Sequence, residues 1–259
     1  MRIASRVSTA LSVVAFALTI GGAQAQEKLR IGTEGAYPPF NNLTSDGQLV
    51  GFDVDIARAL CDEMKVECEF VTQDWDGIIP ALQANRFDAI IASMSITDER
   101  LKQVDFTNKY YNTPPAIVAL KDTDITGVTK EALAGKVIGV QGSTTHSNYS
   151  EATYTDSEVR GYPTADEYKL DLINGRIDAA NDDVTVIEEW LATDEGACCK
   201  IVGTITPVPE THGLGAGIAI RKGETELAEK FNAAIDAIRA NGTYKEINDK
   251  YFGFDAYGG

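Results

Sequence analysis

The sequence has few of the residues that hold metals or act as nucleophiles. Its 259 residues include two histidines, His146 and His212, and four cysteines, with no Cys-x-x-Cys pair. A structural zinc site takes four such ligands at short spacings. The glycine-rich stretches 139–144 and 213–217 lack the lysine and the spacing of nucleotide-binding loops, and no nucleophile-elbow motif occurs. We therefore expect no metal and no cofactor.

Basic residues are also in short supply. Lysine and arginine total 23 against 39 acidic residues, and two of the arginines, Arg2 and Arg6, precede residue 25, so the remainder carries 21 − 39 = −18. Such a charge repels nucleic acid and anionic lipid. This excludes nucleic acid as a partner and favours a cationic small molecule.

Long apolar runs are absent, except for one near the start. Residues 7–20 follow two arginines and precede the small residues 21–25. This run is shorter than the roughly 20 residues of a membrane-spanning helix. The layout is that of a secretory leader, residues 1–25, cleaved after Ala25. No cysteine follows the cleavage site to carry a lipid, so we expect a soluble protein exported to the periplasm of a Gram-negative bacterium.

The four cysteines of an exported chain are more often bridged than free. Cys61 falls near the end of a predicted helix and Cys68 in the next strand. A disulfide between helix and strand is geometrically reasonable. Cys198 and Cys199 are adjacent, and can bond only by distorting the peptide between them. Two buried free thiols and a strained vicinal bridge both remain open.

Two series of alternating strands and helices predict two α/β lobes. The first series contains strands at 28–32, 68–71 and near 89, with helices at 53–64 and 76–85. The second contains strands at 136–140, 159–162, 177–180 and 200–202, with helices at 165–174 and 184–192. A closing amphipathic helix, residues 224–240, is expected to pack on the first lobe.

Two extended apolar runs, 114–120 and 214–220, bracket the second series. They predict that the chain crosses to a second lobe and later returns. Lobe 1 would then comprise residues 26–112 and 213–259, and lobe 2 would be the insertion 113–212. Two such connections can act as a hinge.

Ligands of open α/β sheets bind at the carboxyl ends of strands, and with two lobes the natural site is the cleft between them. The candidate segments are 34–37, Trp75, 93–100, 141–145 and 181–183. The hydroxyl-rich stretch "ASMSITDER" ends on Arg100, which could hold an anion there or merely pair with Glu99 at the surface.

Several motifs, in order, resemble those of the periplasmic polar-amino-acid-binding proteins of ATP-driven importers. They are "RIGTEGAYPPFN", "GFDVDIARALC", "QDWDGIIPALQANRFDAIIASMSITDERLKQVDFT", "GVQGSTT", "NGRIDAA" and "GTYKEINDKYF". The likeness is strongest to binders of lysine/arginine/ornithine, histidine and opines, and spans the mature chain. It implies the two-lobed type II periplasmic binding fold, a mixed sheet in each lobe, a permease as partner and a monomer.

The resemblance implies how the amino-acid backbone is bound. Arg100 would clamp the carboxylate together with Ser95, and lobe 2 would close on it through its loop. Those loop residues are Ser143, Thr144 and Thr145. Ser93, followed by Met94 in the same binding segment, would contact the ammonium. Ala92 departs from the serine frequent in basic-amino-acid binders, so one hydrogen bond is missing.

The acid that binds the α-ammonium falls on Asp183 by the same resemblance, although a one-residue slip would exchange it with Asp182. Either could instead be an acid at the start of the helix near Val184. Glu34 would meet the cation of the ligand's side chain. Tyr37 and Trp75 would flank that side chain, unless they are core aromatics.

An indole face suits a guanidinium. Hence the expected ligand is L-arginine, with lysine, ornithine, histidine and guanidinium-bearing opines as alternatives. The rival reading is an exported dehydratase-like enzyme on the same fold, with Glu34 or Asp183 as acid or base. A sensor that presents its ligand to a receptor is a third possibility.

Overall fold

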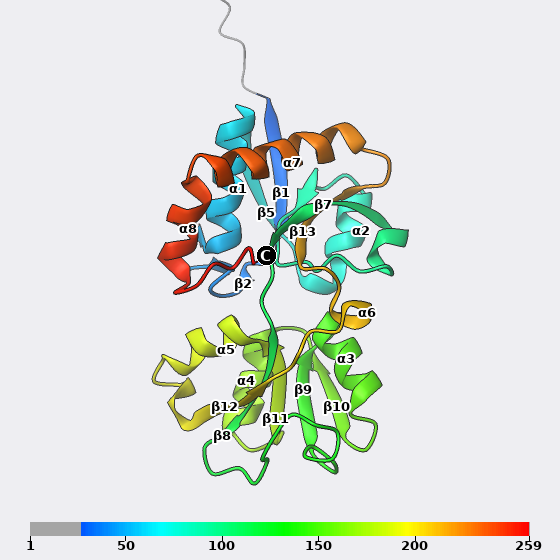
Figure 1. Cartoon of the computed structure of the whole chain (residues 1–259), viewed down its shortest axis with the longest axis vertical. Helices are drawn as coiled ribbons and strands as arrows, with labels where there is room; N and C mark the ends of the chain where they lie inside the picture. Colours follow the sequence, from blue (N-terminus) through cyan, green and yellow to red (C-terminus); the bar gives the residue numbers. More distant parts are fainter. Residues whose placement is uncertain (1–26, 259) are drawn as a thin grey trace, which may run out of the picture.

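The computed structural model describes residues 27–258, which form two α/β lobes joined by two connections (Figure 1). The predicted fold class is thereby confirmed. The predicted leader, residues 1–25, lies outside the described residues. Within residues 27–258, no helix has both the length and the apolar character that crossing a membrane requires.

Lobe 1 is built on a five-stranded mixed sheet. Across the sheet its strands are β5 (Glu67–Thr72), β1 (Lys28–Thr33), β6 (Ala89–Ile90), β13 (Ala216–Arg221) and β7 (Val104–Tyr111). Its helices are α1 (Phe52–Met64), α2 (Ile78–Gln83), α7 (Thr225–Ala240) and α8 (Thr243–Tyr251), with short 3-10 turns η1 (Trp75–Gly77) and η2 (Arg100–Lys102). A small second sheet holds β2 (Ala36–Tyr37), β3 (Asn41–Leu43) and β4 (Leu49–Val50).

Helices cover both faces of this sheet because its strands are apolar on both sides. The neighbours Ala89 and Ile90 on β6 belong to two different buried clusters. Ala89 packs in the cluster that contains residues of α1 and α7, and Ile90 in the one that contains residues of α2. The predicted packing of the closing helix on lobe 1 is therefore confirmed.

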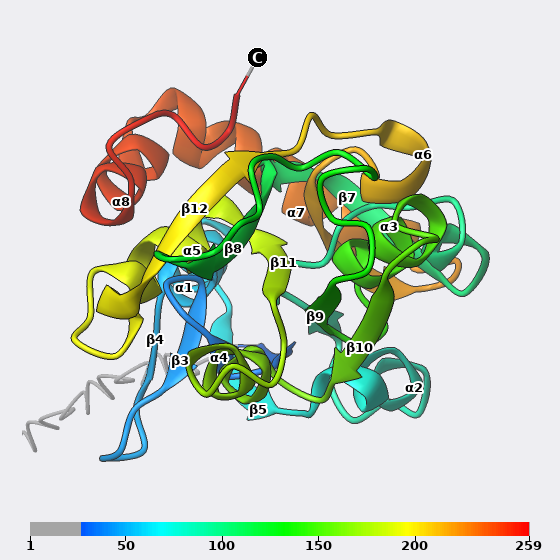
Figure 2. The ribbon, with the colours of Figure 1, turned by 90° about the horizontal axis from the view of Figure 1, so that it is seen from below.

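Lobe 2 repeats this plan with another five-stranded sheet. Its strands are, in order, β10 (Glu158–Tyr162), β9 (Val137–Gln141), β11 (Ala179–Asp183), β8 (Pro115–Leu120) and β12 (Cys199–Thr204). Its helices are α3 (Thr145–Thr153), α4 (Ala165–Ile173), α5 (Val184–Leu191) and α6 (Pro209–His212), with the 3-10 turn η3 (Gly196–Cys198). Seen from below, α6 lies beside α3 (Figure 2).

The chain crosses between the lobes from β7 to β8 and returns from β12 to β13 (Figure 1). Strand β13 then pairs antiparallel with β6 and β7 of lobe 1. On the return, Gly213 has a φ of 78°, and a Cβ there would lie 2.2 Å from the carbonyl oxygen of Ile96. Only glycine accommodates both constraints. The single-residue bounds at 112 and 213 stay a prediction.

One predicted helix differs in the structure. Residues 76–85 were expected to be a single helix, but the 3-10 turn η1 precedes the short helix α2. Pro80 lacks an amide hydrogen and is tolerated only in the first turn, which sets the start of α2. Asn85, with a φ of 59°, lies beyond its end. This arrangement leaves Trp75 on a turn, beside the cleft.

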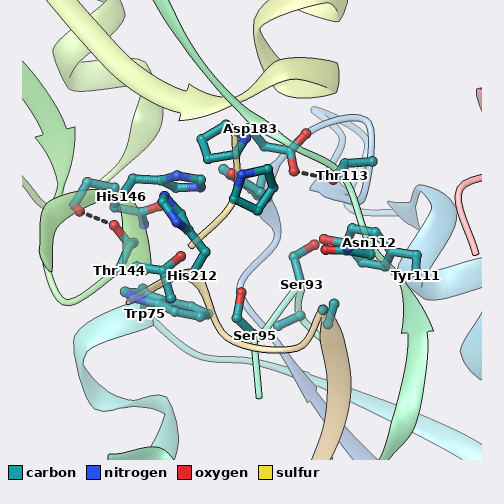
Figure 3. A pocket seen from close by; sticks show the side chains of 18 of the residues that line it. Trp75, Ser93, Ser95, Tyr111, Asn112, Thr113, Thr144, His146, Asp183 and His212 are labelled. Atoms are coloured by element: carbon teal, nitrogen blue, oxygen red, sulfur yellow. Dashed lines mark hydrogen bonds between the residues drawn. The ribbon is translucent and has the colours of Figure 1, made fainter. Parts of the chain in front are cut away.

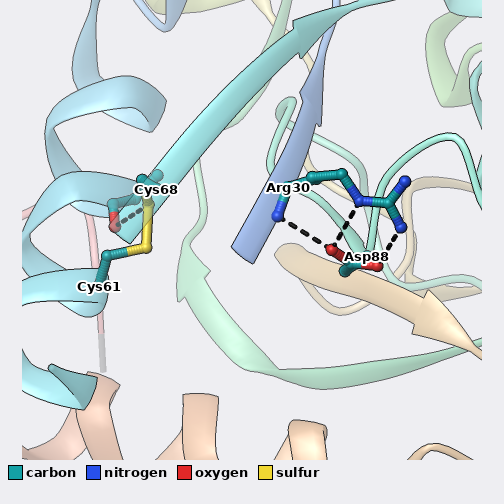
Figure 4. Close-up of a disulfide and its surroundings, with 5 residues drawn as sticks. Arg30, Cys61, Cys68 and Asp88 are labelled. Carbon is teal, nitrogen blue, oxygen red and sulfur yellow. Dashed lines mark hydrogen bonds and ion pairs between the residues drawn. A yellow bond between two sulfur atoms is a disulfide. The ribbon is translucent and has the colours of Figure 1, made fainter. Parts of the chain in front are cut away.

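The predicted disulfide between Cys61 and Cys68 is present, with Cα atoms 5.9 Å apart, and ties α1 to β5 (Figure 4). Figure 4 also shows Arg30 of β1 paired with Asp88, Nη2 to Oδ1 2.6 Å. Cys198 and Cys199 are free thiols whose sulfur atoms lie 3.3 Å apart. Of the two alternatives the structure has free thiols, although Cys198 is exposed.

Candidate functional site

A pocket lies between the two lobes, and most of the predicted binding residues line it (Figure 3). They are Glu34, Tyr37, Trp75, Ser93, Ser95, Arg100, Thr144, Thr145 and Asp183. The structure does not bring the side chains of Met94 and Ser143 to it. Met94 is buried in the apolar cluster near α2, because alternate residues of an extended segment point to opposite sides. Ser143 contributes its backbone carbonyl instead.

Arg100 is a buried cation at the lobe interface, with 9 % of its surface exposed. Its guanidinium donates to the carbonyl oxygens of Ser95 (3.0 Å) and Ser143 (3.2 Å). Among residues 27–258 no carboxylate oxygen lies within salt-bridge distance of it, so the surface pair with Glu99 is not formed. Burial lowers the pKa of Arg100 to about 10. A buried guanidinium without a carboxylate is a ready partner for an incoming anion.

The loop of lobe 2 that faces Arg100 begins helix α3. The Thr144 side chain caps this helix, accepting from the amide of Ser147 at 3.1 Å. Its hydroxyl also donates to the carbonyl oxygen of Gln141 at 2.7 Å. Both Thr144 and Thr145 are buried and line the pocket. The start of an α-helix presents free amides and a partial positive charge, which together with Arg100 suit a carboxylate.

Ser93 is held by an acid that the sequence analysis did not identify as part of the site. Its hydroxyl donates to Asp53 at 2.9 Å, and Asp53 also accepts from Tyr110 (2.7 Å) and Asn41 (2.9 Å). Burial raises the pKa of Asp53 to about 6. Because the Ser93 hydroxyl donates its hydrogen bond to Asp53, its oxygen still has lone pairs that can accept a hydrogen bond from an ammonium group.

The geometry favours Asp183 over Asp182 as the acid of the pocket. Asp183 lines the pocket, ends β11 and caps α5, accepting from the amide of Thr185 at 2.8 Å and from the hydroxyl of Thr113. Burial raises the pKa of Asp183. Asp182 is turned away, and it accepts from the hydroxyls of Tyr37 and Tyr168. Asp183 therefore also has the other role considered for it, that of an acid at the start of the helix near Val184.

Glu34 is a second buried acid, on the lobe 1 side of the pocket. Its Oε1 atom accepts a hydrogen bond from Nε2 of Gln141, in lobe 2, at 2.6 Å. Burial raises the pKa of Glu34 to about 7, although the bond from Gln141 lowers it in part. A carboxylate so poorly solvated gains most from a cation placed next to it.

The two predicted aromatics bridge the lobes as well as line the pocket. The hydroxyl of Tyr37 donates a hydrogen bond to Asp182, and its ring stacks on Phe40 in the core. Tyr37 is therefore a core aromatic that also lines the pocket, and its contact with a ligand side chain stays a prediction. The indole Nε1 of Trp75 donates to the carbonyl oxygen of Ser143 at 3.2 Å. The guanidinium near its ring, 5.3 Å from the centroid, is that of Arg100. Stacking of a ligand on Trp75 stays a prediction.

Among residues 27–258, four side chains that line the cleft donate hydrogen bonds directly from one lobe to the other. These bonds join Glu34 to Gln141, Tyr37 to Asp182, and both Trp75 and Arg100 to the Ser143 carbonyl. The two lobes are therefore in a closed arrangement. The histidines His146 and His212, neither predicted for the site, also line the pocket. Within the described residues no group of three or more His, Cys, Asp or Glu is placed to hold a metal.

Comparison with known proteins identifies relatives along nearly the whole chain. Residues 29–254 match the family model of bacterial extracellular solute-binding proteins, family 3. The chain is 52 % identical to an L-arginine-binding protein of Pseudomonas aeruginosa, over 90 % of this chain and 91 % of that protein. It is 40 % identical to ABC transporter arginine-binding protein 1 of Escherichia coli, over 89 % and 93 % of the two chains.

A solved structure, an ancestral arginine-binding protein bound to arginine, superposes with a TM-score of 0.82 at 39 % identity. The match covers 88 % of this chain and 100 % of that one. The resemblance seen in the sequence motifs and the type II fold are both confirmed. The chain belongs to family 3 of the bacterial extracellular solute-binding proteins.

Proposed function

We propose that this protein is a soluble periplasmic receptor that captures a basic L-amino acid, preferably arginine, between its lobes and delivers it to an ABC importer. The observation that carries the proposal is the charge pattern of one buried pocket. It holds the cation Arg100 and the two acids Asp183 and Glu34. A basic amino acid has the complementary set: one carboxylate and two cations.

Each charge of the pocket has a role in this proposal. Arg100, with the amides that start α3, binds the α-carboxylate. Asp183 and the hydroxyl of Ser93 bind the α-ammonium. Glu34 binds the distal cation, because that carboxylate is buried and, among residues 27–258, accepts a hydrogen bond from the Gln141 amide but has no cation beside it. A neutral amino acid would leave the Glu34 carboxylate buried without a counter-charge. The free energy needed to desolvate this carboxylate would then weaken binding.

Closure of the lobes is the signal to the importer. Arg100 and Glu34 belong to lobe 1, whereas Thr144 and Asp183 belong to lobe 2, so one ligand meets all of them only when the lobes are together. A ligand that binds the closed form better shifts the population towards it. The names of the Pseudomonas and Escherichia relatives support arginine and an ABC importer. We propose that the receptor acts as a monomer without a cofactor.

The decisive test is a thermal-shift panel of the twenty amino acids and several opines on residues 26–259, since a ligand raises the melting temperature according to its affinity. L-arginine should give the largest shift. Calorimetry should then show saturable one-to-one binding, with unchanged arginine recovered afterwards. Conversion of the ligand would favour the dehydratase-like enzyme instead, and a panel without any response from basic amino acids would overturn the proposal.

Glu34→Gln should weaken arginine about ten- to a hundredfold, because it removes a charge-assisted contact to the distal cation. The glutamine side chain keeps the size and can still face Gln141. Binding of L-glutamine, which has no distal cation, should change little. Titration calorimetry with both ligands measures the two effects. Equal losses for arginine and glutamine would contradict the role of Glu34.

Arginine affinity should depend on pH near neutrality. Burial raises the pKa of Glu34 to about 7. Arginine binds the ionised carboxylate, so Glu34 must lose its proton on binding, and the pKa falls in the complex. The affinity should therefore be fully present above pH 7 and fall below it, by up to about tenfold per pH unit.

Calorimetry between pH 5.5 and 8 tests this, in two buffers of different ionisation enthalpy that report the released proton. Glu34→Gln should lose most of the dependence. What remains should come from Asp183, whose pKa is also raised by burial. An arginine affinity that is the same at both ends of the range would contradict the prediction.

A further inference from the structure

The only two histidines of the chain line the same pocket, although neither carries a role in the proposed function. The same pocket is also lined by Trp75 and Thr144 (Figure 3). His146 places its Nε2 atom 3.6 Å from Oδ1 of Asp182. Among residues 27–258 no acid lies within ion-pair distance of His212, and its ring has contacts on several sides.

The His212 ring is fixed by its neighbours. It is the last residue of α6, with 7 % of its surface exposed, and its ring lies against Tyr149 of α3, centroids 4.6 Å apart. Its Nδ1 atom accepts a hydrogen bond from the backbone amide of Val208 at 3.0 Å. The Thr211 hydroxyl, 3.4 Å from Nδ1, can donate to the same atom.

These contacts determine the tautomer. A backbone amide can only donate, so Nδ1 must present its lone pair, and in a neutral imidazole the proton then resides on Nε2. Burial lowers the pKa of His212 to about 4, which keeps the ring neutral. The Nε2 atom is buried and has no hydrogen-bond partner among residues 27–258. His212 therefore presents an unpaired N–H donor in a pocket built for a ligand.

We propose that His212 is a ligand-binding residue whose Nε2–H donates a hydrogen bond to the α-carboxylate of the bound amino acid. This inference rests on the proposed function. The α-ammonium and the guanidinium of arginine carry only donors, so the carboxylate is the one group of the ligand that can accept from Nε2–H.

The position agrees with this assignment. Trp75 is adjacent to the guanidinium of Arg100, and Thr144 starts the helix that faces it. His212 lines the same pocket as both residues. Its ring contacts Tyr149 on α3, the helix that Thr144 caps. The carboxylate thus receives a charged donor from lobe 1 and a neutral one from His212, on the segment that returns from lobe 2. A buried N–H is costly to leave without a partner, so a ligand carboxylate that accepts from Nε2–H adds to the affinity.

Two substitutions separate the donor from the ring. His212→Phe keeps an aromatic ring against Tyr149 and removes the N–H, whereas His212→Gln retains an amide N–H at nearly the same reach. Titration calorimetry should show arginine about tenfold or more weaker with His212→Phe, and a smaller loss with His212→Gln. The loss should shrink with L-argininamide, because its amide oxygen is a weaker acceptor than a carboxylate. Glu210→Ala, an exposed position on the same short helix, should bind arginine like the wild type.

A spectroscopic test uses the low histidine content. With 15N-labelled histidine in the untagged protein, only four ring nitrogens give signals. The Nε2–H tautomer of His212 should be present with and without arginine, and its proton should move downfield on binding. An Nδ1–H tautomer would overturn the inference.

The outcomes separate this inference from the proposed function. Equal arginine affinity of the wild type and His212→Phe would overturn the inference alone, leaving a water as the partner of Nε2–H. A wild-type protein that binds no basic amino acid would overturn the proposed function, and the inference with it.

Discussion

Arg100→Ala should abolish binding of every amino acid tested, with an affinity loss of about a hundredfold or more. The substitution removes the guanidinium from the pocket and leaves the ligand carboxylate buried without that counter-charge. Among residues 27–258 this buried guanidinium is bonded to two carbonyl oxygens and to no carboxylate. Its removal therefore costs the fold little, because a poorly compensated buried charge is also removed.

The measurement is calorimetry with arginine, histidine and glutamine, together with the melting temperature of the empty protein. The melting temperature should stay near that of the wild type or rise. Arg100→Lys should rescue part of the affinity, since it restores the charge but not the planar fork. Arg176→Ala removes an exposed pair with Asp171 and is a matched control that should bind normally. If Arg100→Ala kept its affinity for amino acids, Arg100 would not be the group that binds the ligand carboxylate.

Asp183→Asn should weaken all amino acids by roughly a hundredfold, because a charged hydrogen bond to the α-ammonium is lost in a buried site. Asparagine is as good a helix cap as aspartate, so α5 keeps its start and the fold is spared. Loss of affinity with an unchanged melting temperature would then report the charge itself. The effect should be similar for arginine and glutamine, in contrast to Glu34→Gln.

Asp182→Asn is the matched control for this prediction. Asp182 does not itself line the pocket; it accepts from the hydroxyls of Tyr37 and Tyr168, and an amide oxygen can replace one of these acceptors. We expect a smaller affinity loss and a lower melting temperature. If Asp182→Asn is the variant that loses ammonium recognition, the two acids have exchanged roles.

Periodicity predicted most of the fold because the apolar faces repeat at helix and strand spacing. The helix expected at 53–64 begins one residue earlier, and the two extended apolar runs are β8 and β13. Strand β7 was missed. Its sequence, VDFTNKYY, mixes polar and apolar residues without a period of two, and its pairing with β13 joins segments more than 100 residues apart.

The site was predicted from residue types at strand ends and from a family resemblance, whereas its cross-lobe partners were not. Glu34 and Gln141 are 107 positions apart, and Tyr37 and Asp182 are 145 apart. No local pattern encodes such pairs, because they depend on how the lobes meet. Asp53 was assigned only to the first turn of α1, where acids are common. Its hydrogen bond with Ser93 could not be predicted from the sequence, because the two residues are 40 positions apart and only the fold brings them together.

The hydrogen bonds that join the two lobes directly have a consequence for transport kinetics. Because these bonds need no ligand atom, they hold the closed site in its binding geometry and so raise the affinity for the ligand. They also increase the share of receptors that close with nothing inside. An importer that recognises the closed shape is then occupied by unloaded receptors, which act as competitive inhibitors of uptake. Strengthening these bonds, for example around Gln141, would therefore raise the affinity for scarce substrate. It would also lower the maximal rate of uptake at high receptor concentration.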